Sequence, residues 1–263
     1  RSHADKFEQA SIDEAFIDVS KRISSYDEAF ELAKEIKEEI KEKTGLPCSI
    51  GIGPSKLIAK MACEAAKPNG IKVVKEDETK AFISDMPIGK LYGVGKKTAE
   101  KLESLGYKKV SDVANANPMK LMDIFGVYGI DLYKAANGID ESEVEESYEV
   151  KSIGREKTFE KDTRSIEELE KAIRDMSAEI VQDVKRQGFA FSTVSIKLRF
   201  SDFDEHIKSK SLNYSTDSEQ EIEKSAIELL NEYYDKEELV RKIGVRVSGL
   251  KPFKGQKKLA AFC

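Results

Sequence analysis

The sequence predicts an α+β chain made of more than one domain, and three observations support this. The chain has 263 residues, a length that favours two small domains over one large one. Its hydrophobic residues make up 40% of the total, with 16 glycines and 6 prolines, so it can bury real cores. Segments with the periods of strands and of helices alternate along the chain, and over residues 151–250 they follow the order βαββαβ.

Residues 1–84 are predicted to form the first α+β domain. A strand over Lys6–Ile12 and another over Ala15–Val19 meet at Asp13 and Glu14. Apolar residues at spacings of three and four then predict an amphipathic helix over 26–43. The remaining elements are a strand over 47–52, a helix over 56–66 that Ser55 caps, and a strand over 71–74.

Residues 85–138 are predicted to form short helices joined by glycine turns. Gly93-Val94-Gly95 precedes a helix that starts with Lys96 and Lys97, which is typical of a helix-hairpin-helix. Amide groups at the start of such a helix bind phosphate oxygens, although a plain helical corner is the alternative. A looser second copy spans 121–136. Residues 139–150 are acidic and predict a solvated tether.

The last domain is predicted from six elements that end near residue 250. Two helices on one side of such a sheet would leave the other face open. The elements are strands over 151–160, 190–200, 205–213 and 241–250, and helices over 165–187 and 217–234.

The open face of this sheet is predicted to be basic. Along residues 193–200, polar and basic side chains alternate with apolar ones, and the apolar set must face the helices. Apart from Asp204 at the border, no acid occurs at the positions assigned to this face, which favours the backbone of DNA as a ligand over a merely solvated surface. The predicted basic residues are Arg155, Lys157, Lys197, Arg199, Lys208, Lys210, Lys242 and Arg246, with His206 beside them.

Charge and cysteine content restrict the class of protein further. The net charge is −5, of which residues 1–150 contribute −6 and residues 151–263 contribute +1. The three cysteines lie far apart without a C-x-x-C pair, which favours a reducing compartment, and we expect the cytoplasm. No apolar run is long enough to cross a membrane, so no membrane partner is predicted.

The sharpest motif is Ser11-Ile12-Asp13-Glu14-Ala15-Phe16. Adjacent side chains in a strand point to opposite faces, but at a turn Asp13 and Glu14 can converge. Two crowded carboxylates are stabilised by a cation between them, and oxygen ligands favour Mg²⁺. An exposed acidic turn without a ligand is the alternative.

Three motifs in this order resemble the Y-family, translesion DNA polymerases of the polymerase IV type, and we expect an archaeal member. They are the Ser11–Phe16 motif, Ala-Lys-Pro-Asn-Gly at 66–70, and the hairpin at 92–95. Residues 151–155 and 241–246 also match the two ends of the little-finger domain of the family. The resemblance implies a partial ferredoxin-like palm (1–84), a helical thumb (85–138), a linker (139–150) and a little finger (151–250).

The resemblance also implies roles for individual residues. Asp13 and Glu14 match the second catalytic acidic pair, which holds two Mg²⁺ ions between the primer end and the incoming nucleotide. Lys67 matches the lysine that contacts the triphosphate, although a lysine that complements the helix dipole is the alternative. The implied partners are primer-template DNA and deoxynucleoside triphosphates, and the implied state is a monomer. The activity implied is low-fidelity nucleotidyl transfer that tolerates lesions.

One part of the family pattern does not occur in this sequence. The family begins with a strand that carries Asp-x-Asp-x-Phe, followed by fingers, and neither precedes Arg1. We therefore expect Asp13 and Glu14 alone to bind metal weakly and the chain alone to be inactive. The alternative function is a non-catalytic DNA-repair module that binds the DNA backbone and a sliding clamp.

The chain ends in a motif that resembles the sliding-clamp peptide of replication proteins. Gln256, Leu259 and Phe262 match its glutamine and apolar positions, although Cys263 stands where an aromatic residue is expected. An unstructured basic terminus is the alternative.

Overall fold

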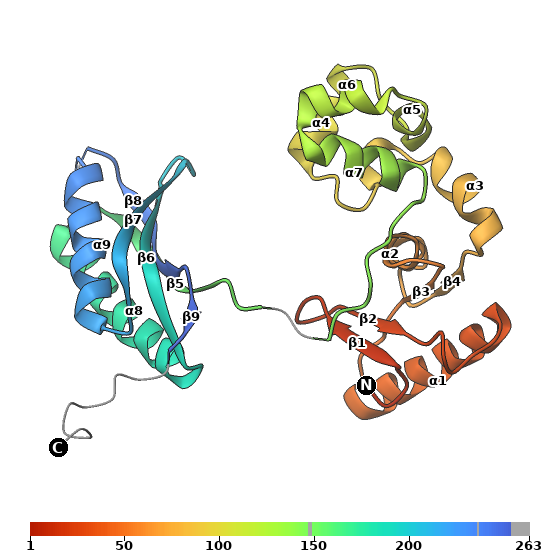
Figure 1. Ribbon diagram of the computed structural model, residues 1–263, viewed down its shortest axis with the longest axis horizontal. Helices are drawn as coiled ribbons and strands as arrows, with labels where there is room; N and C mark the ends of the chain where they lie inside the picture. The colour runs from red at the N-terminus through yellow and green to blue at the C-terminus, as the bar shows by residue number, and fades with distance from the viewer. Residues whose placement is uncertain (147–148, 236, 254–263) are drawn as a thin grey trace. The chain divides into compact units, whose positions relative to one another are not determined.

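The structure is a computed structural model that describes residues 1–146, 149–235 and 237–253 (Figure 1). The chain divides into two compact units, Arg1–Tyr148 and Glu149–Cys263, which we call the N-terminal and C-terminal units. The α+β architecture predicted from the sequence is confirmed.

The N-terminal unit begins with the predicted hairpin. Strands β1 (Lys6–Gln9) and β2 (Ala15–Asp18) pair antiparallel, and their last pair is Gln9 with Ala15. Residues 10–14 therefore form the loop, in which the amides of Ala10 and Ser11 donate to the carbonyl oxygen of Glu14 at 3.0 and 3.1 Å. Asp13 and Glu14 thus lie where the chain reverses direction, as predicted.

The next elements are two helices and a pair of short parallel strands. Ser25 caps the N-terminus of helix α1 (Tyr26–Thr44). Ser55 caps helix α2 (Lys56–Ala65), and its side chain accepts a hydrogen bond from the amide of Ile58. Helix α2 connects strands β3 (Ile50–Ile52) and β4 (Ile71–Val73), which pair in parallel. The strand expected over 47–52 begins only at Ile50, because the carbonyl oxygens of Cys48 and Ser49 accept hydrogen bonds from the side chains of Lys37 and Cys63.

Short helices complete the N-terminal unit. The predicted hairpin occurs at residues 91–95, but the element before it is a single 3₁₀ turn and not an α-helix. Gly93 has φ of 91°, a conformation that favours glycine, and Gly95 precedes the next helix. The elements are η1 (Glu76–Glu78), α3 (Thr79–Ser84), η2 (Ile88–Lys90), α4 (Lys96–Ser104), α5 (Val110–Ala114), α6 (Pro118–Phe125) and α7 (Val127–Ala136).

Aliphatic side chains from these helices make one core with those of α2. Each such side chain contributes about 1.5–3 kcal/mol when fully buried. The core includes Ile58, Ile83, Ile88, Leu102, Val110, Leu121 and Leu132.

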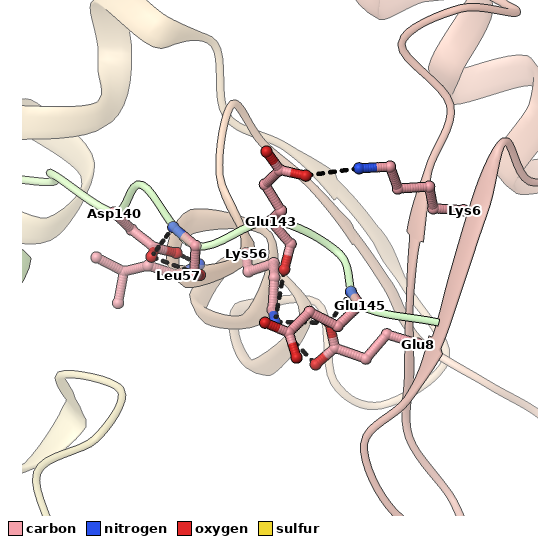
Figure 2. Close-up of polar contacts among 8 residues, drawn as sticks. Lys6, Glu8, Lys56, Leu57, Asp140, Glu143 and Glu145 are labelled. Carbon is pink, nitrogen blue, oxygen red and sulfur yellow. Dashed lines mark hydrogen bonds and ion pairs between the residues drawn. The ribbon is translucent and has the colours of Figure 1, made fainter. Parts of the chain in front are cut away.

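The acidic segment after α7 is exposed along most of residues 141–146, as its composition predicted, but it is also held against the N-terminal unit. The amide of Leu57 donates to the carboxylate of Asp140 at 2.8 Å, and the amide of Glu145 donates to Glu8 at 2.9 Å (Figure 2). The acidic composition indicated exposure, but it could not show that groups of β1 and α2 bind part of this segment.

The C-terminal unit has the predicted βαββαβ order. Its antiparallel strands lie in the order β5-β8-β6-β7, and both helices cover one face of the sheet (Figure 1). Its core contains Leu169, Ile173, Ile180, Phe191, Ile196, Leu230 and Val245. The elements are β5 (Ser152–Thr163), α8 (Ile166–Arg186), β6 (Phe189–Phe200), β7 (Glu205–Thr216), α9 (Glu219–Tyr233), β8 (Val240–Ser248) and the short β9 (Lys251–Pro252).

In the part of the chain that the structure describes, no helix combines the length and the apolar character needed to cross a bilayer.

Candidate functional site

The hairpin loop presents Asp13 to solvent. Its carboxylate accepts a hydrogen bond of 2.6 Å from the hydroxyl of Ser11. This hydrogen bond, together with the positive charges of Lys60 and Lys67, holds the pKa of Asp13 below its ordinary value. Asp13 is therefore an ionised, exposed oxygen ligand at neutral pH.

Glu14 begins a chain of alternating charges that runs along α2. Lys60 forms ion pairs with Glu14 and, at 2.9 Å, with Glu64. Burial lowers the pKa of Lys60, but the hydrogen bonds from its ammonium group to Glu14 and Glu64 outweigh this effect and raise the pKa overall. Glu64 also accepts from Lys67 at 2.7 Å. These contacts connect the hairpin loop electrostatically to the lysine predicted to contact a triphosphate.

Lys67 lies just after the C-terminal end of α2 and is half exposed. Its hydrogen bond to Glu64 raises the pKa of its ammonium group. The structure thus gives Lys67 a side-chain partner one turn earlier, in addition to its place at a helix end.

The carboxylates of Asp13 and Glu14 suit part of a site for a hard divalent cation, because ionised carboxylates offer only acceptor oxygens. Among the described residues, however, no group of three or more His, Cys, Asp or Glu side chains is arranged to hold a metal ion. Glu14 is also paired with Lys60. The residues described here therefore fit a partial metal site, and a cation must compete with Lys60 for Glu14.

The glycine hairpin around Gly93 and Gly95 is exposed and is bound to helix α7. The hydroxyl of Tyr128 on α7 donates to the carbonyl oxygen of Gly93 at 2.7 Å. Within the described ranges no side chain caps the N-terminus of α4 at Gly95, and Lys96 and Lys97 are exposed. The free amides and the two lysines can together accept an anion.

The open face of the C-terminal sheet carries four of the predicted basic residues. Cross-strand partners share a face, and Lys197 pairs with Gly244, Arg199 with Lys242, and Ser195 with Arg246. These positions alternate with buried apolar residues such as Ile196 and Val245. The structure thus confirms the predicted placement on the open face for Lys197, Arg199, Lys242 and Arg246.

The prediction that the basic residues of β7 lie on the open face was wrong, because the alternate residues of this strand lie there. Lys197 faces Ile207, and Lys208 and Lys210 oppose the buried Ile196 and Val194, so both lysines lie on the helix-covered side. Lys210 pairs with Glu228 of α9, and the ammonium group of Lys208 lies 4.5 Å from the centre of the Tyr233 ring. His206 likewise opposes Leu198 and packs edge-on against Phe200.

The prediction for β5 was wrong in the same way. Arg155 opposes Val245 and Lys157 opposes Ile243, which places both on the helix-covered side. Arg155 forms ion pairs with Asp183 and, at 3.0 Å, with Glu179, both on α8. Ile153 and Phe159 lie on the same side of β5 as Arg155. These two apolar residues were the indication in the sequence that this side faces the helices.

Two carboxylates occupy the open face, which was predicted to carry no acid apart from Asp204 at its border. Glu156 accepts from Lys197 and Lys242 at 2.8 Å each, and these hydrogen bonds lower its pKa to about 2. Glu205 pairs with Arg199 at 2.5 Å and with Lys197 at 3.1 Å. The open face thus carries alternating basic and acidic side chains, and its described basic residues outnumber the two acidic ones.

Arg246 differs from the other three cations of this face. It is exposed, and it forms no ion pair with any residue that the structure describes. It borders a hollow of about 370 Å³ that is lined by Gly154, Ser195, Lys197, Ile207 and Gly244, among others. Arg246 is the cation on this face that is available to a ligand without breaking an internal pair.

Sequence reasoning did not identify Lys60, Glu156 or Glu205. The spacing of Lys60 and Glu64 by four residues was a signal that they share a face of α2. Glu156 has the parity of Gly154 and Thr158 on β5, which the structure places on the open face. Gln256, Leu259 and Phe262 lie outside the described residues.

Comparisons with known proteins agree with this geometry. Family models match three segments: "impB/mucB/samB family" over residues 1–64, "IMS family HHH motif" over 76–107, and "impB/mucB/samB family C-terminal domain" over 150–260. The DNA polymerase IV of Methanosarcina acetivorans is 38% identical, over 98% of this chain and 71% of the relative. The DNA polymerase IV of Lactococcus lactis subsp. cremoris is 36% identical, over 95% of this chain and 69% of the relative.

Solved structures show the same likeness. A Y-family polymerase chimera of Dbh and Dpo4 matches with a TM-score of 0.83 and 30% identity, over 95% of this chain and 72% of that one. An insertion ternary complex of Dbh DNA polymerase matches with a TM-score of 0.61 and 29% identity, over 94% and 72%. The chain therefore belongs to the Y family of DNA polymerases, which are DNA-directed nucleotidyltransferases. The resemblance drawn from the three sequence motifs is confirmed.

Proposed function

We propose that Asp13 and Glu14 form the second acidic pair of a Y-family polymerase site, in a protein that copies damaged DNA with low fidelity. The observation that carries this proposal is the hairpin loop, which presents both residues next to the charged side of α2. Ionised, exposed Asp13 and partly exposed Glu14 would each offer oxygens to Mg²⁺.

Each side chain of this site then has a distinct task. A bound Mg²⁺ supplies charge neutralisation for the phosphates and for the attacking hydroxyl group. Asp13 stays ionised because Ser11 donates to it, so it needs no proton loss before binding a cation. For Glu14 to hold a cation, Lys60 would have to release it, and Lys60 could then keep Glu64 as its partner.

Lys67 is proposed to contact the triphosphate of the incoming nucleotide. Its only ion pair among the described residues is with Glu64, which also pairs with Lys60. A triphosphate offers more negative charge than one carboxylate and attracts the ammonium group as a point charge. Release of Lys67 would leave Glu64 neutralised by Lys60.

The remaining basic residues are proposed to hold primer-template DNA through its backbone. Gly93, Gly95, Lys96 and Lys97 would bind phosphate at the thumb hairpin, and Lys197, Arg199, Lys242 and Arg246 would bind it on the open sheet face. Backbone contacts do not depend on base identity, which suits a polymerase that passes lesions.

We further propose that this chain by itself does not extend a primer. The described residues supply two neighbouring carboxylates and no group of three, and a two-metal site needs a carboxylate that bridges the ions. DNA and clamp binding without catalysis, as in a repair module, would then be the activity of this chain alone. Removal of residues 256–263, which include Gln256, Leu259 and Phe262, tests clamp binding by pull-down.

Metal binding and primer extension together test the proposed function. Paramagnetic resonance with Mn²⁺ should show weak binding that Asp13→Asn and Glu14→Gln reduce further. The matched control is Asp18→Asn on the same hairpin, whose carboxylate accepts from the amide of Ser20 at 2.9 Å. Equal Mn²⁺ affinity in all four proteins would exclude the metal site, and primer extension by the unmodified chain with Mg²⁺ would refute its proposed inactivity.

A further inference from the structure

The segment Asp140–Glu145, which we call the strap, lies against the hairpin and the first turn of α2 (Figure 2). It follows the last thumb helix and precedes the C-terminal unit. Figure 2 shows its contacts with β1 on one side and with α2 on the other.

A buried ion pair forms the centre of this contact. The side chain of Glu8 is 5% exposed, and both of its oxygens accept from the ammonium group of Lys56, at 2.8 and 2.6 Å. The same two side chains also bind the strap: Lys56 donates to the carbonyl oxygen of Glu143 at 3.2 Å, and Glu8 accepts from the amide of Glu145 at 2.9 Å. These contacts involve backbone atoms of the strap, so they hold the path of the chain itself.

Two further contacts fix the strap on either side of this pair. Helix α2 has no acidic residue in its own first turn, and the carboxylate of Asp140 accepts from the amide of Leu57 there. A carboxylate at this place satisfies a free helix amide and complements the helix dipole. Lys6 of β1 pairs with Glu143 at 2.6 Å, although the side chain of Glu143 is largely exposed and that of Lys6 partly exposed.

We propose that Glu8 and Lys56 are positioning residues that clamp the strap and thereby set the length of free chain between the two units. With the strap held, six residues (146–151) separate it from the first strand of the C-terminal unit. Residues 137–139 stay bound to the end of α7, because their amides donate to carbonyl oxygens of that helix. With the strap released, the connection is therefore the twelve residues 140–151. At the length of an extended residue, its maximum reach would rise from about 20 Å to about 40 Å.

This tether length matters for DNA binding, and here the inference rests on the proposed function of the C-terminal unit. When one unit has bound DNA, the effective concentration of the other falls with roughly the −3/2 power of tether length. A tether about twice as long should therefore weaken binding to a long duplex about threefold. Binding by each unit separately should not change, because the strap contacts lie outside the proposed DNA surfaces.

Distance measurements on the full chain without DNA test the clamp directly. Two dyes attached through unnatural amino acids at the exposed positions Lys120 and Lys171 would report the distribution of distances between the units. The variant Glu8→Leu with Lys56→Met removes the clamp while keeping apolar packing, a replacement that buried ion pairs often tolerate. Its matched control is Glu39→Gln with Lys43→Met, which removes a Glu–Lys pair on α1.

A second variant tests the strap side and leaves the buried pair intact. Glu145→Pro deletes the amide hydrogen that donates to Glu8, and Glu146→Pro places the same ring one residue later, where the amide makes no hydrogen bond within the described ranges. Lys56→Arg keeps a cation beside Glu8 and should preserve the distances of the unmodified chain.

The proposal predicts a broader distance distribution for the Leu/Met double variant and for Glu145→Pro, with unchanged melting of each unit and no broadening in the two controls or in Lys56→Arg. An unchanged distribution in both the double variant and Glu145→Pro would overturn it. If the double variant fails to fold, Glu145→Pro alone decides. Failure of the unmodified chain to bind DNA would count against the proposed function and would leave the distance result standing.

Discussion

The ammonium group of Lys60 joins the hairpin to α2 through its ion pair with Glu14, and it contacts Glu64 one helical turn later on its own helix. Lys60 is mostly buried, with 16% of its side chain exposed, whereas Glu14 is 42% exposed. A protein cation therefore occupies one side of the carboxylate that the proposed metal ion needs.

Removal of this cation should strengthen metal binding. Lys60→Met leaves Glu14 without its positive partner, and an incoming Mn²⁺ then no longer displaces an ammonium group. We expect Mn²⁺ to bind about three- to tenfold more tightly at low salt, which corresponds to roughly 0.7–1.4 kcal/mol. Titration followed by paramagnetic resonance measures this. Lys34→Met, which breaks the exposed pair with Glu31, should leave the affinity as it is, and weaker binding in Lys60→Met would contradict the prediction.

Arg246 and Lys210 should differ in their effect on DNA binding. Arg246 is exposed on the open face, whereas Lys210 pairs with Glu228 on the side covered by α9. Arg246→Ala should flatten the slope of log affinity against log salt by about 0.9, the value for one lost phosphate contact on duplex DNA. Lys210→Ala should not change this slope. Fluorescence anisotropy over a range of salt concentrations makes the comparison, and equal slopes for the two variants would place the DNA elsewhere.

The C-terminal unit should lose stability in acid partly through Glu156. Hydrogen bonds from Lys197 and Lys242 lower the pKa of Glu156 from 4.5 to about 2, so the folded state favours the ionised carboxylate. The stabilisation is complete above the unfolded pKa and is lost as pH falls from about 4.5 toward 2. Glu156→Gln should reduce the difference in thermal midpoint between pH 6 and pH 3. Glu160→Gln, on the same strand, is the control that should keep the full difference.

Gly51 should tolerate no side chain. A Cβ at this position would lie 2.0 Å from the carbonyl oxygen of Ala59 and 2.2 Å from the amide nitrogen of Cys63, both on α2. Gly51→Ala should therefore force the strand and helix apart and destabilise the N-terminal unit by about 1–3 kcal/mol. A Cβ at Gly95 meets open space, so Gly95→Ala should cost far less. Urea unfolding of both variants compares the two sites, and similar losses would contradict the close packing of β3 and α2.

Much of the fold could be predicted from the sequence where one pattern dominates. The hairpin at Asp13 and Glu14 lies between two apolar runs, and helix α2 has a serine cap and a periodic apolar face. All six elements of the C-terminal sheet and its helices occur in the predicted order, because long strands and helices carry strong periodic signals.

The side of β7 could not be predicted, since both of its faces mix polar and apolar residues. On β5 the signal was weak, because Ile153 and Phe159 share their side with Arg155 and Lys157. Lys208 lies with His206 and Lys210 on the helix-covered side of β7, whereas the open face carries the apolar Ile207. Only pairing with the neighbouring strand fixes which parity faces the helices, and this information is not local in the sequence. For the same reason, the contact of Glu8 with Lys56 could not be inferred from either strand or helix alone.

The two described sheets of the N-terminal unit, β1–β2 and β3–β4, are separate ladders of four-residue and three-residue strands, whereas the C-terminal strands β5 to β8 have 9 to 12 residues in one ladder. Short separate ladders contain few interstrand hydrogen bonds that depend on one another. The N-terminal unit should therefore exchange its amide hydrogens through local opening of individual elements. The second unit should open as one cooperative body, which gives the proposed DNA-binding face a more durable scaffold than the part that carries Asp13 and Glu14.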